Sequence, residues 1–264
     1  MNARVAVILF PGTNCEDETI RAVNATGLHA DLIRWNQHLQ LGRYAAYILP
    51  GGWSYEDRVR AGAIAAHDDL MDLIRQEASR GKPILGICNG AQVLLEAKLI
   101  CASNGAALAL APNRWGYRCA WTKVQLTIPP SANVFTSTFT QGEVFDVPIA
   151  HGEGRFTASD PQVFSQLQQN GQIPLIYVDP AGQPATTFPW NPNGALMSAA
   201  GISNTEGNIL AFMPHPERAS WWLQHSPQRR PAGWQARPDR FEMLAPAHRI
   251  FSSLATYVQQ VAHS

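Results

Sequence analysis

Cys88 is the residue of this chain best placed to act as a nucleophile. It lies between Gly86 and Gly90, where the apolar run Pro83–Ile87 gives way to a helix-forming run. A chain that turns sharply from a strand into a helix strains the residue at the turn, and small residues two positions to either side relieve the crowding. The pattern G-x-C-x-G therefore predicts a nucleophile elbow, although a buried structural thiol beside two strand-breaking glycines has the same pattern.

A nucleophilic thiol at this turn requires a base, because the turn itself activates it little. A helix N-terminus stabilises a negative charge by about 0.3–1 kcal/mol, which lowers a thiol pKa by less than one unit from about 8.5. Of the eight histidines, His215 has the most suitable setting, since it follows the strand-like run 208–213 and stands between two prolines. In an extended segment Glu217 points to the same side, where a carboxylate orients the ring. An ordinary proline-rich turn is the alternative.

Gly51 and Gly52 directly follow the apolar run 44–49. Glycines at such a turn leave backbone N–H groups unobstructed, so Gly52 is predicted to present one N–H to an oxyanion while the N–H of Asn89 presents the second. Alone, a Gly-Gly pair usually marks only a turn. Beside the elbow and the His-x-Glu pair, it predicts an oxyanion hole.

Cys15 is the competing thiol, and we predict that it is not the nucleophile. It lacks flanking glycines, and the carboxylates at positions 16–18 disfavour a thiolate. Just before it, Thr13 and Asn14 are expected to cap the following helix rather than to contact another protein.

The segment "HGEGRF" (151–156) has two interpretations. His151, Glu153 and Arg155 alternate, so in an extended segment they share one face that could turn toward a substrate or a partner. A structural ion pair between Glu153 and Arg155 is the other interpretation.

Composition narrows the class of protein. Twenty Lys and Arg balance twenty Asp and Glu, so the basic excess of a nucleic-acid-binding protein is missing. The four cysteines form no CxxC pair, and too few clustered ligands accompany His-x-Glu, so we expect no metal site and a reduced compartment. The N-terminal apolar run 5–10 is too short for a signal peptide or a membrane span. A soluble, cytoplasmic protein without membrane partners is expected.

Short apolar runs alternate with helical patterns up to about residue 104. This βαβα order predicts an α/β fold with a mostly parallel central sheet, helices on both faces and function at the carboxyl ends of the strands. Later pieces predict antiparallel additions to the same sheet, and a final helix is expected at 246–262. We therefore predict one domain, 1–264, with a Trp-, Arg- and Pro-rich excursion at 219–241. The expected strands are 5–10, 30–35, 44–49, 82–87, 121–128, 143–150, 174–178 and 208–213, and the expected helices before the last are 16–26, 61–79 and 91–99.

These motifs, in this order, resemble a class I glutamine amidotransferase domain, which has a flavodoxin-like architecture. The likeness is narrower still: it is to the glutaminase subunits of phosphoribosylformylglycinamidine synthase, an enzyme of purine biosynthesis. It runs from Val5 to about Ala219 and resumes in the final helix, and "HGEGRF" and "NPNG" would not be shared by a general amidotransferase. The segments that carry it are "FPGTNCEDE" (10–18), "LPGGWSYEDRVRAGAIAA" (49–66), "GICNGAQVL" (86–94), "PIAHGEGRF" (148–156), "NPNG" (191–194) and "AGISNTEGNILAFMPHPERA" (200–219).

The resemblance implies that Cys88 attacks glutamine, that His215 acts as base and then as acid, and that Glu217 orients the ring. It also implies that ammonia passes to a separate synthetase subunit, which converts formylglycinamide ribonucleotide to formylglycinamidine ribonucleotide with ATP and Mg; a further small subunit is a possible component. No cofactor is expected on this chain, which has no G-x-x-x-x-G-K-[ST] loop. The residues implied around the substrate are Gly52 and Asn89 at the oxyanion, with Gln92, His151 and Gly152 near the glutamine.

Other functions are open to the same motifs. The chain could supply ammonia to another amidotransferase, or be a non-catalytic regulatory homologue, which would normally lose one of the three catalytic residues. A cysteine peptidase also has an elbow, but the late "MPHPER" argues against it. The excursion 219–241, with Arg229, Arg230, Arg237 and Arg240 among its residues, departs from the family pattern. Its Trp and Arg content is typical of an interface, so we expect contact with the synthetase, against a solvated loop as the alternative.

Overall fold

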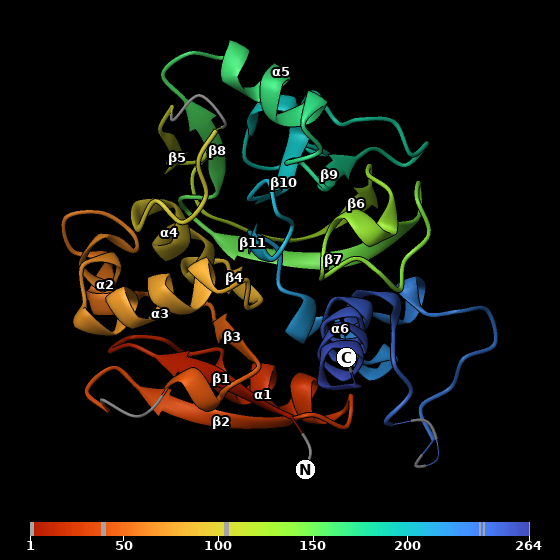
Figure 1. Ribbon diagram of the computed structural model, residues 1–264. Coiled ribbons are helices and arrows are strands. Elements are labelled where there is room, and N and C mark those ends of the chain that lie inside the picture. Colours follow the sequence, from red (N-terminus) through yellow and green to blue (C-terminus); the bar gives the residue numbers. More distant parts are fainter. Residues whose placement is uncertain (1–2, 38–40, 103–105, 238, 240, 264) are drawn as a thin grey trace.

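A nine-stranded sheet with the order β2-β1-β3-β4-β11-β10-β9-β6-β7 runs through the protein (Figure 1). The computed structural model describes residues 3–37, 41–102, 106–237, 239 and 241–263. Two further strands, β5 and β8, pair with each other beside this sheet. The strands are β1 Arg4–Leu9, β2 His29–Arg34, β3 Ala46–Leu49, β4 Ile84–Ile87, β5 Leu108–Ala111, β6 Arg118–Leu126, β7 Val144–His151, β8 Arg155–Ala158, β9 Leu175–Val178, β10 Ala199–Ser203 and β11 Ile209–Phe212.

Strands β2, β1, β3, β4 and β11 are paired in parallel, and the remaining pairings in the large sheet are antiparallel. The sequence assigned 208–213 to the antiparallel additions, and this was wrong for its pairing with β4: β11 lies beside β4, parallel to it, with Ile87 opposite Phe212. All four residues of β11 are buried, as is usual for strands inside a helix-covered parallel sheet. The carboxyl ends of β4 and β11 therefore meet at one edge.

Helices cover both faces of the sheet, as the sequence predicted. Helices α2, α3 and α4 lie on one side, while α1 and α6 lie together on the other (Figure 1). The expected helix 61–79 is divided, because Asp68 accepts a hydrogen bond from the N–H of Leu70 and starts a new helix there. The helices are α1 Glu16–Asn24, α2 Ala63–Ala66, α3 Asp69–Ser79, α4 Asn89–Glu96, α5 Gln162–Gln169 and α6 Arg249–His263. Within the described residues no helix is both long and apolar enough to cross a bilayer.

The expected capping of α1 by Thr13 or Asn14 was wrong. Cys15 occupies the N-cap position, and no side chain caps this helix. The hydroxyl of Thr13 instead accepts a hydrogen bond from the N–H of Phe10, and the side-chain oxygen of Asn14 accepts one from the thiol of Cys15. Both side chains stabilise the loop that crosses in front of α1.

Candidate active site

The turn between β4 and α4 has the strained geometry that the G-x-C-x-G pattern predicts. Cys88 has φ 51° and ψ −107°, a conformation that residues with a side chain rarely adopt. A Cβ on Gly86 would lie 2.5 Å from the carbonyl oxygen of Gly90, and a Cβ on Gly90 would overlap the carbonyl of Leu49. Both glycines are therefore required by close backbone packing, which confirms the prediction for this turn.

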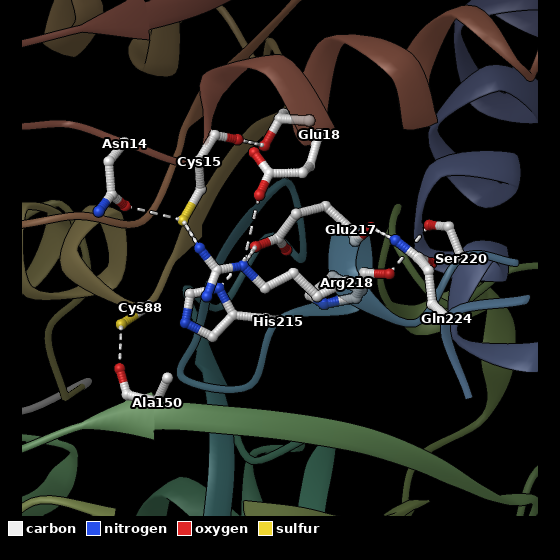
Figure 2. Close-up of polar contacts among 12 residues, drawn as sticks. Asn14, Cys15, Glu18, Cys88, Ala150, His215, Glu217, Arg218, Ser220 and Gln224 are labelled. Atoms are coloured by element: carbon white, nitrogen blue, oxygen red, sulfur yellow. Dashed lines mark hydrogen bonds and ion pairs between the residues drawn. The ribbon is translucent and has the colours of Figure 1, made fainter. Parts of the chain in front are cut away.

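His215 reaches the same edge of the sheet from β11. The N–H of Cys88 donates to the carbonyl of Phe212 at 2.8 Å, and the N–H of His215 donates to the carbonyl of Pro148 at 2.8 Å. A Cβ on Gly51 would lie 2.7 Å from Cε1 of His215 and 3.4 Å from Cβ of Cys88, so this glycine leaves room for the ring beside the elbow. Figure 2 shows the imidazole and the Cys88 thiol approaching from different elements.

Glu217 lies against the ring of His215. The Nδ1 and Oε1 atoms are 2.5 Å apart, and both side chains are buried. The contact is made across a 3₁₀ turn, Pro216–Arg218, and not along the extended segment that the sequence analysis assumed. Burial opposes a charge on the ring, but the Glu217 carboxylate and the nearby thiols of Cys88 and Cys15 outweigh it and hold the pKa of His215 well above its ordinary value.

A second thiol, Cys15, also lies beside His215. One atom each from Cys15, His215 and Glu217 lie within 4.8 Å of one another. The argument that His-x-Glu lacks a clustered third ligand was therefore wrong. Nη2 of Arg218 donates to the Cys15 sulfur at 3.0 Å (Figure 2), however, and this guanidinium charge disfavours a resident metal cation.

Burial is the main reason that Cys15 is a poor thiolate. It raises the pKa of the Cys15 thiol above its ordinary value, with a further increase from Glu217 that His215 and Arg218 partly offset. The carboxylates at 16–18, which the sequence analysis had blamed, are not among the causes. The prediction that Cys15 has a disfavoured thiolate holds for a different physical reason.

The backbone of Gly52 faces the cavity beside Cys88. Gly52 has φ +150°, and a Cβ there would lie 2.7 Å from the carbonyl oxygen of Gly12. Asn89 is the first residue of α4, and its Oδ1 accepts the N–H of Ser54 at 3.0 Å, which ties the two turns together. Among the described residues, neither the Gly52 N–H nor the Asn89 N–H donates a hydrogen bond to another protein group.

A cavity of about 180 Å³ opens beside the thiol. Its lining includes Cys88, Gly52 and the three residues predicted to lie near a substrate, Gln92, His151 and Gly152. The Gln92 side chain is already occupied, because its Nε2 donates to the carbonyl of Glu153 at 2.6 Å and its Oε1 accepts from Asn89.

His151 is a neutral imidazole in the wall of the cavity. Burial lowers its pKa to about 3, and the charge of His215 contributes to that decrease. Asn113 contacts its Nδ1 through Nδ2, at 3.2 Å, and the amide orientation is fixed because Asn113 Oδ1 accepts the N–H of Gly154. An amide nitrogen cannot accept a hydrogen bond, so the proton of His151 resides on Nε2. This Nε2 is buried without a protein partner among the described residues.

The two interpretations of "HGEGRF" are now distinguished. Arg155 donates from Nε to the carbonyl of Pro112 at 3.0 Å and forms no ion pair with Glu153, so the structural-pair interpretation was wrong. Glu153 instead lines the cavity with His151.

Sequence reasoning missed Asp57, Arg218, Trp53 and Tyr117, all of which line the cavity. Arg218 directly follows the predicted Glu217, and Asp57 lies five positions after the predicted Gly52, so proximity to predicted site residues was a usable signal for both. Tyr117 carries no such signal, since it reaches the cavity only through the folding of a distant loop.

This architecture, with a cysteine elbow beside an imidazole and a carboxylate, defines the glutamine amidotransferase class, and residues 2–258 match the CobB/CobQ-like glutamine amidotransferase domain family. Relatives named phosphoribosylformylglycinamidine synthase subunit PurQ include those of Methanothrix thermoacetophila, 42% identical over 97% of this chain and 98% of its own length, and Thermomicrobium roseum, 38% identical over 99% of both. The chain belongs to the PurQ family of glutamine amidotransferases.

Solved structures agree with this assignment. The structure of PurLQS from Thermotoga maritima contains a chain with a TM-score of 0.74 and 30% identity, over 98% of this chain and 100% of that one. A GMP synthase component from Thermoplasma acidophilum has a TM-score of 0.57 at 14% identity, over 100% of this chain and 97% of that one, a similarity that extends to the fold.

Proposed function

We propose that this chain is the glutaminase subunit of a phosphoribosylformylglycinamidine synthase. The observation that carries the proposal is the junction of Cys88, on a strained elbow, with the His215–Glu217 pair at the carboxyl ends of two adjacent parallel strands. A regulatory homologue would not need to retain this arrangement.

The proposed reaction proceeds through a thioester. Cys88 Sγ attacks the side-chain amide carbon of glutamine as His215 takes the thiol proton, and the N–H groups of Gly52 and Asn89 stabilise the oxyanion. His215 then gives its proton to the leaving nitrogen, and ammonia departs. Water, deprotonated by His215, attacks the thioester, which releases glutamate and restores the thiol. The raised pKa of His215 favours the imidazolium that this sequence forms twice.

The ammonia passes to a synthetase subunit that uses ATP and Mg to form formylglycinamidine ribonucleotide from formylglycinamide ribonucleotide. We place both cofactors on that subunit. A third small subunit is part of the proposed assembly, in line with the name PurLQS of the Thermotoga maritima relative. A cytoplasmic location is proposed as well, supported by the four free cysteines among the described residues.

A reconstituted assay tests this function. The protein is mixed with its synthetase partner, ATP, Mg and formylglycinamide ribonucleotide, and product is measured with either glutamine or ammonium as nitrogen source. We expect Cys88→Ala to abolish glutamine-dependent synthesis and to leave ammonium-dependent synthesis intact. Glutamine-dependent turnover in this variant would rule out Cys88 as nucleophile. Glutamine hydrolysis that never couples to this ribonucleotide would instead favour the glutaminase of another amidotransferase.

A further inference from the structure

Two carboxylates without cationic partners face the catalytic cavity. Asp57, at the end of the 3₁₀ turn Ser54–Asp57, and Glu153, in the turn between β7 and β8, both line it. Among the described residues neither forms an ion pair, and the nearby Arg58 pairs with the exposed Glu56 instead. Acidic side chains usually find a cation or full hydration, so this pair requires an explanation.

One hydrogen-bond network holds both carboxylates in place. Nδ2 of Asn89 donates to Asp57 at 3.2 Å and to Gln92 at 2.8 Å, and Gln92 in turn donates to the carbonyl of Glu153 at 2.6 Å. Asn89 follows the nucleophile directly in sequence. The positions of the two carboxylates are thereby tied to the position of the Cys88 thiol.

The backbone of Asp57 is strained. Asp57 has φ 52°, and it ends a run in which Tyr55 and Glu56 also have positive φ. Side-chain-bearing residues avoid this region, and such conformations persist where the surrounding structure enforces them, often at binding sites. The strain places a carboxylate at the cavity that a relaxed turn would direct elsewhere.

The surroundings of the two carboxylates disfavour the ionised pair. Burial raises the pKa of Asp57 to about 6, and the negative charge of Glu153 contributes, while the hydrogen bond from Asn89 acts in the opposite direction. A cation bound between the two carboxylates would relieve their repulsion.

His151 supplies an independent sign of a ligand in the same cavity. Its Nε2–H is buried, it is a donor, and it has no acceptor among the described residues. Buried donors in native structures are normally paired. The cavity thus combines acceptors for a cation with a donor that lacks an acceptor, which suits a zwitterionic amino acid.

We propose that Asp57 and Glu153 bind the α-ammonium group of glutamine and select substrates that carry it. The inference rests on the proposed glutaminase function. With the side-chain amide at Cys88, the opposite end of glutamine has only the remainder of this 180 Å³ cavity to occupy, and the carboxylates lie there. They do not touch the reacting amide, so they determine specificity and not the chemical step.

The test compares glutamine with glutaramate, which has the same amide and carboxylate but lacks the α-amino group. In the complex with synthetase, Asp57→Asn and Glu153→Gln should each raise KM for glutamine about 10- to 100-fold, the range for loss of a hydrogen bond to a charged group. The kcat should change little, and the preference for glutamine over glutaramate should fall by the same factor as KM rises. Glu56→Gln is the matched control, because this exposed carboxylate neighbours Asp57 and points away from the cavity residues.

An unchanged preference in both variants would overturn the proposal, as would an equal loss with both substrates, which indicates a structural role. Ammonium-dependent synthesis checks that the complex is intact. If Asp57→Asn does not fold, Glu153→Gln alone decides, since its carboxylate makes no protein hydrogen bond in the described structure. Failure of the proposed function is separate: the wild-type complex would then hydrolyse neither amide.

Discussion

At the scale of single residues, His215 is shared by two thiols, and their surroundings decide which one reacts. Cys15 is held by the Arg218 guanidinium and by the amide oxygen of Asn14, and burial raises its pKa. Cys88 stands on the elbow, next to the unpaired N–H of Asn89 that an oxyanion would need. Attack from Cys88 therefore places the developing charge where donors are available, and we assign the chemistry to it.

Asp57 should cost the protein stability at neutral pH. Its pKa rises from 3.8 in the unfolded chain to about 6 in the fold, so between these values only the unfolded chain is ionised. The folded state then loses stability as the pH rises from about 4 to 6, and the loss is complete above that range. Asp57→Asn removes it, and Asn tolerates the positive φ.

We expect Asp57→Asn to raise the free energy of unfolding by about 1 kcal/mol at pH 7.5, a value reduced for the partial exposure of the side chain. Urea unfolding at pH 7.5 and pH 4 measures the effect, which should vanish at the lower pH. A gain of equal size at both pH values would show that charge is not its cause. A more stable variant with weaker glutamine binding is the usual exchange at a functional site.

At the scale of elements, periodicity was a good guide to the first half of the chain. The alternating runs predicted β1, α1, β2, β3, β4 and α4, because each apolar run is bounded by glycine or proline. The short elements β5, β8, β10 and α5 were missed, since four to eight residues carry too little pattern. The place of β11 next to β4 depends on long-range pairing that no local signal contains.

The excursion 219–241 is more firmly packed than its composition suggested. Trp221 is buried with the Arg21 guanidinium over its ring, and Arg229 pairs with Asp146. Arg230 stacks on Trp234, while Arg240 lies outside the described residues. Several of the Trp and Arg residues thus stabilise the protein itself, and the deletion of 221–239 would damage the core.

A surface substitution tests the synthetase contact better. Leu223 is 43% exposed in the excursion, and apolar side chains of this kind are typical of interfaces. We expect Leu223→Asp to weaken binding to the synthetase about tenfold or more, with unchanged thermal stability. Gln228→Asp, also exposed in the excursion, is the control for the added charge. Equal affinity of both variants, measured by calorimetry, would favour the solvated-loop alternative.

At the scale of the whole molecule, one buried cluster connects the parallel strands with the later antiparallel ones and with α6. The α6 helix joins distant parts of the chain, because Ser253 contacts Thr138 at 2.8 Å, Arg249 pairs with Glu143, and the helix lies against α1. This continuity favours the prediction of a single domain, 1–264.

The domain prediction has a direct test in α6. Leu254 is 1% exposed there, so Leu254→Ala should lower the free energy of unfolding by about 2–5 kcal/mol, while Gln259→Ala on the exposed face should be near neutral. Unfolding is followed by tryptophan fluorescence, which reports mainly the chain after residue 104, and by the reactivity of Cys88 in a background without the exposed Cys101 and Cys119. If one core holds the chain together, both signals shift to lower urea by the same amount. A shift confined to fluorescence would mean that the two halves unfold independently and that the chain contains two domains.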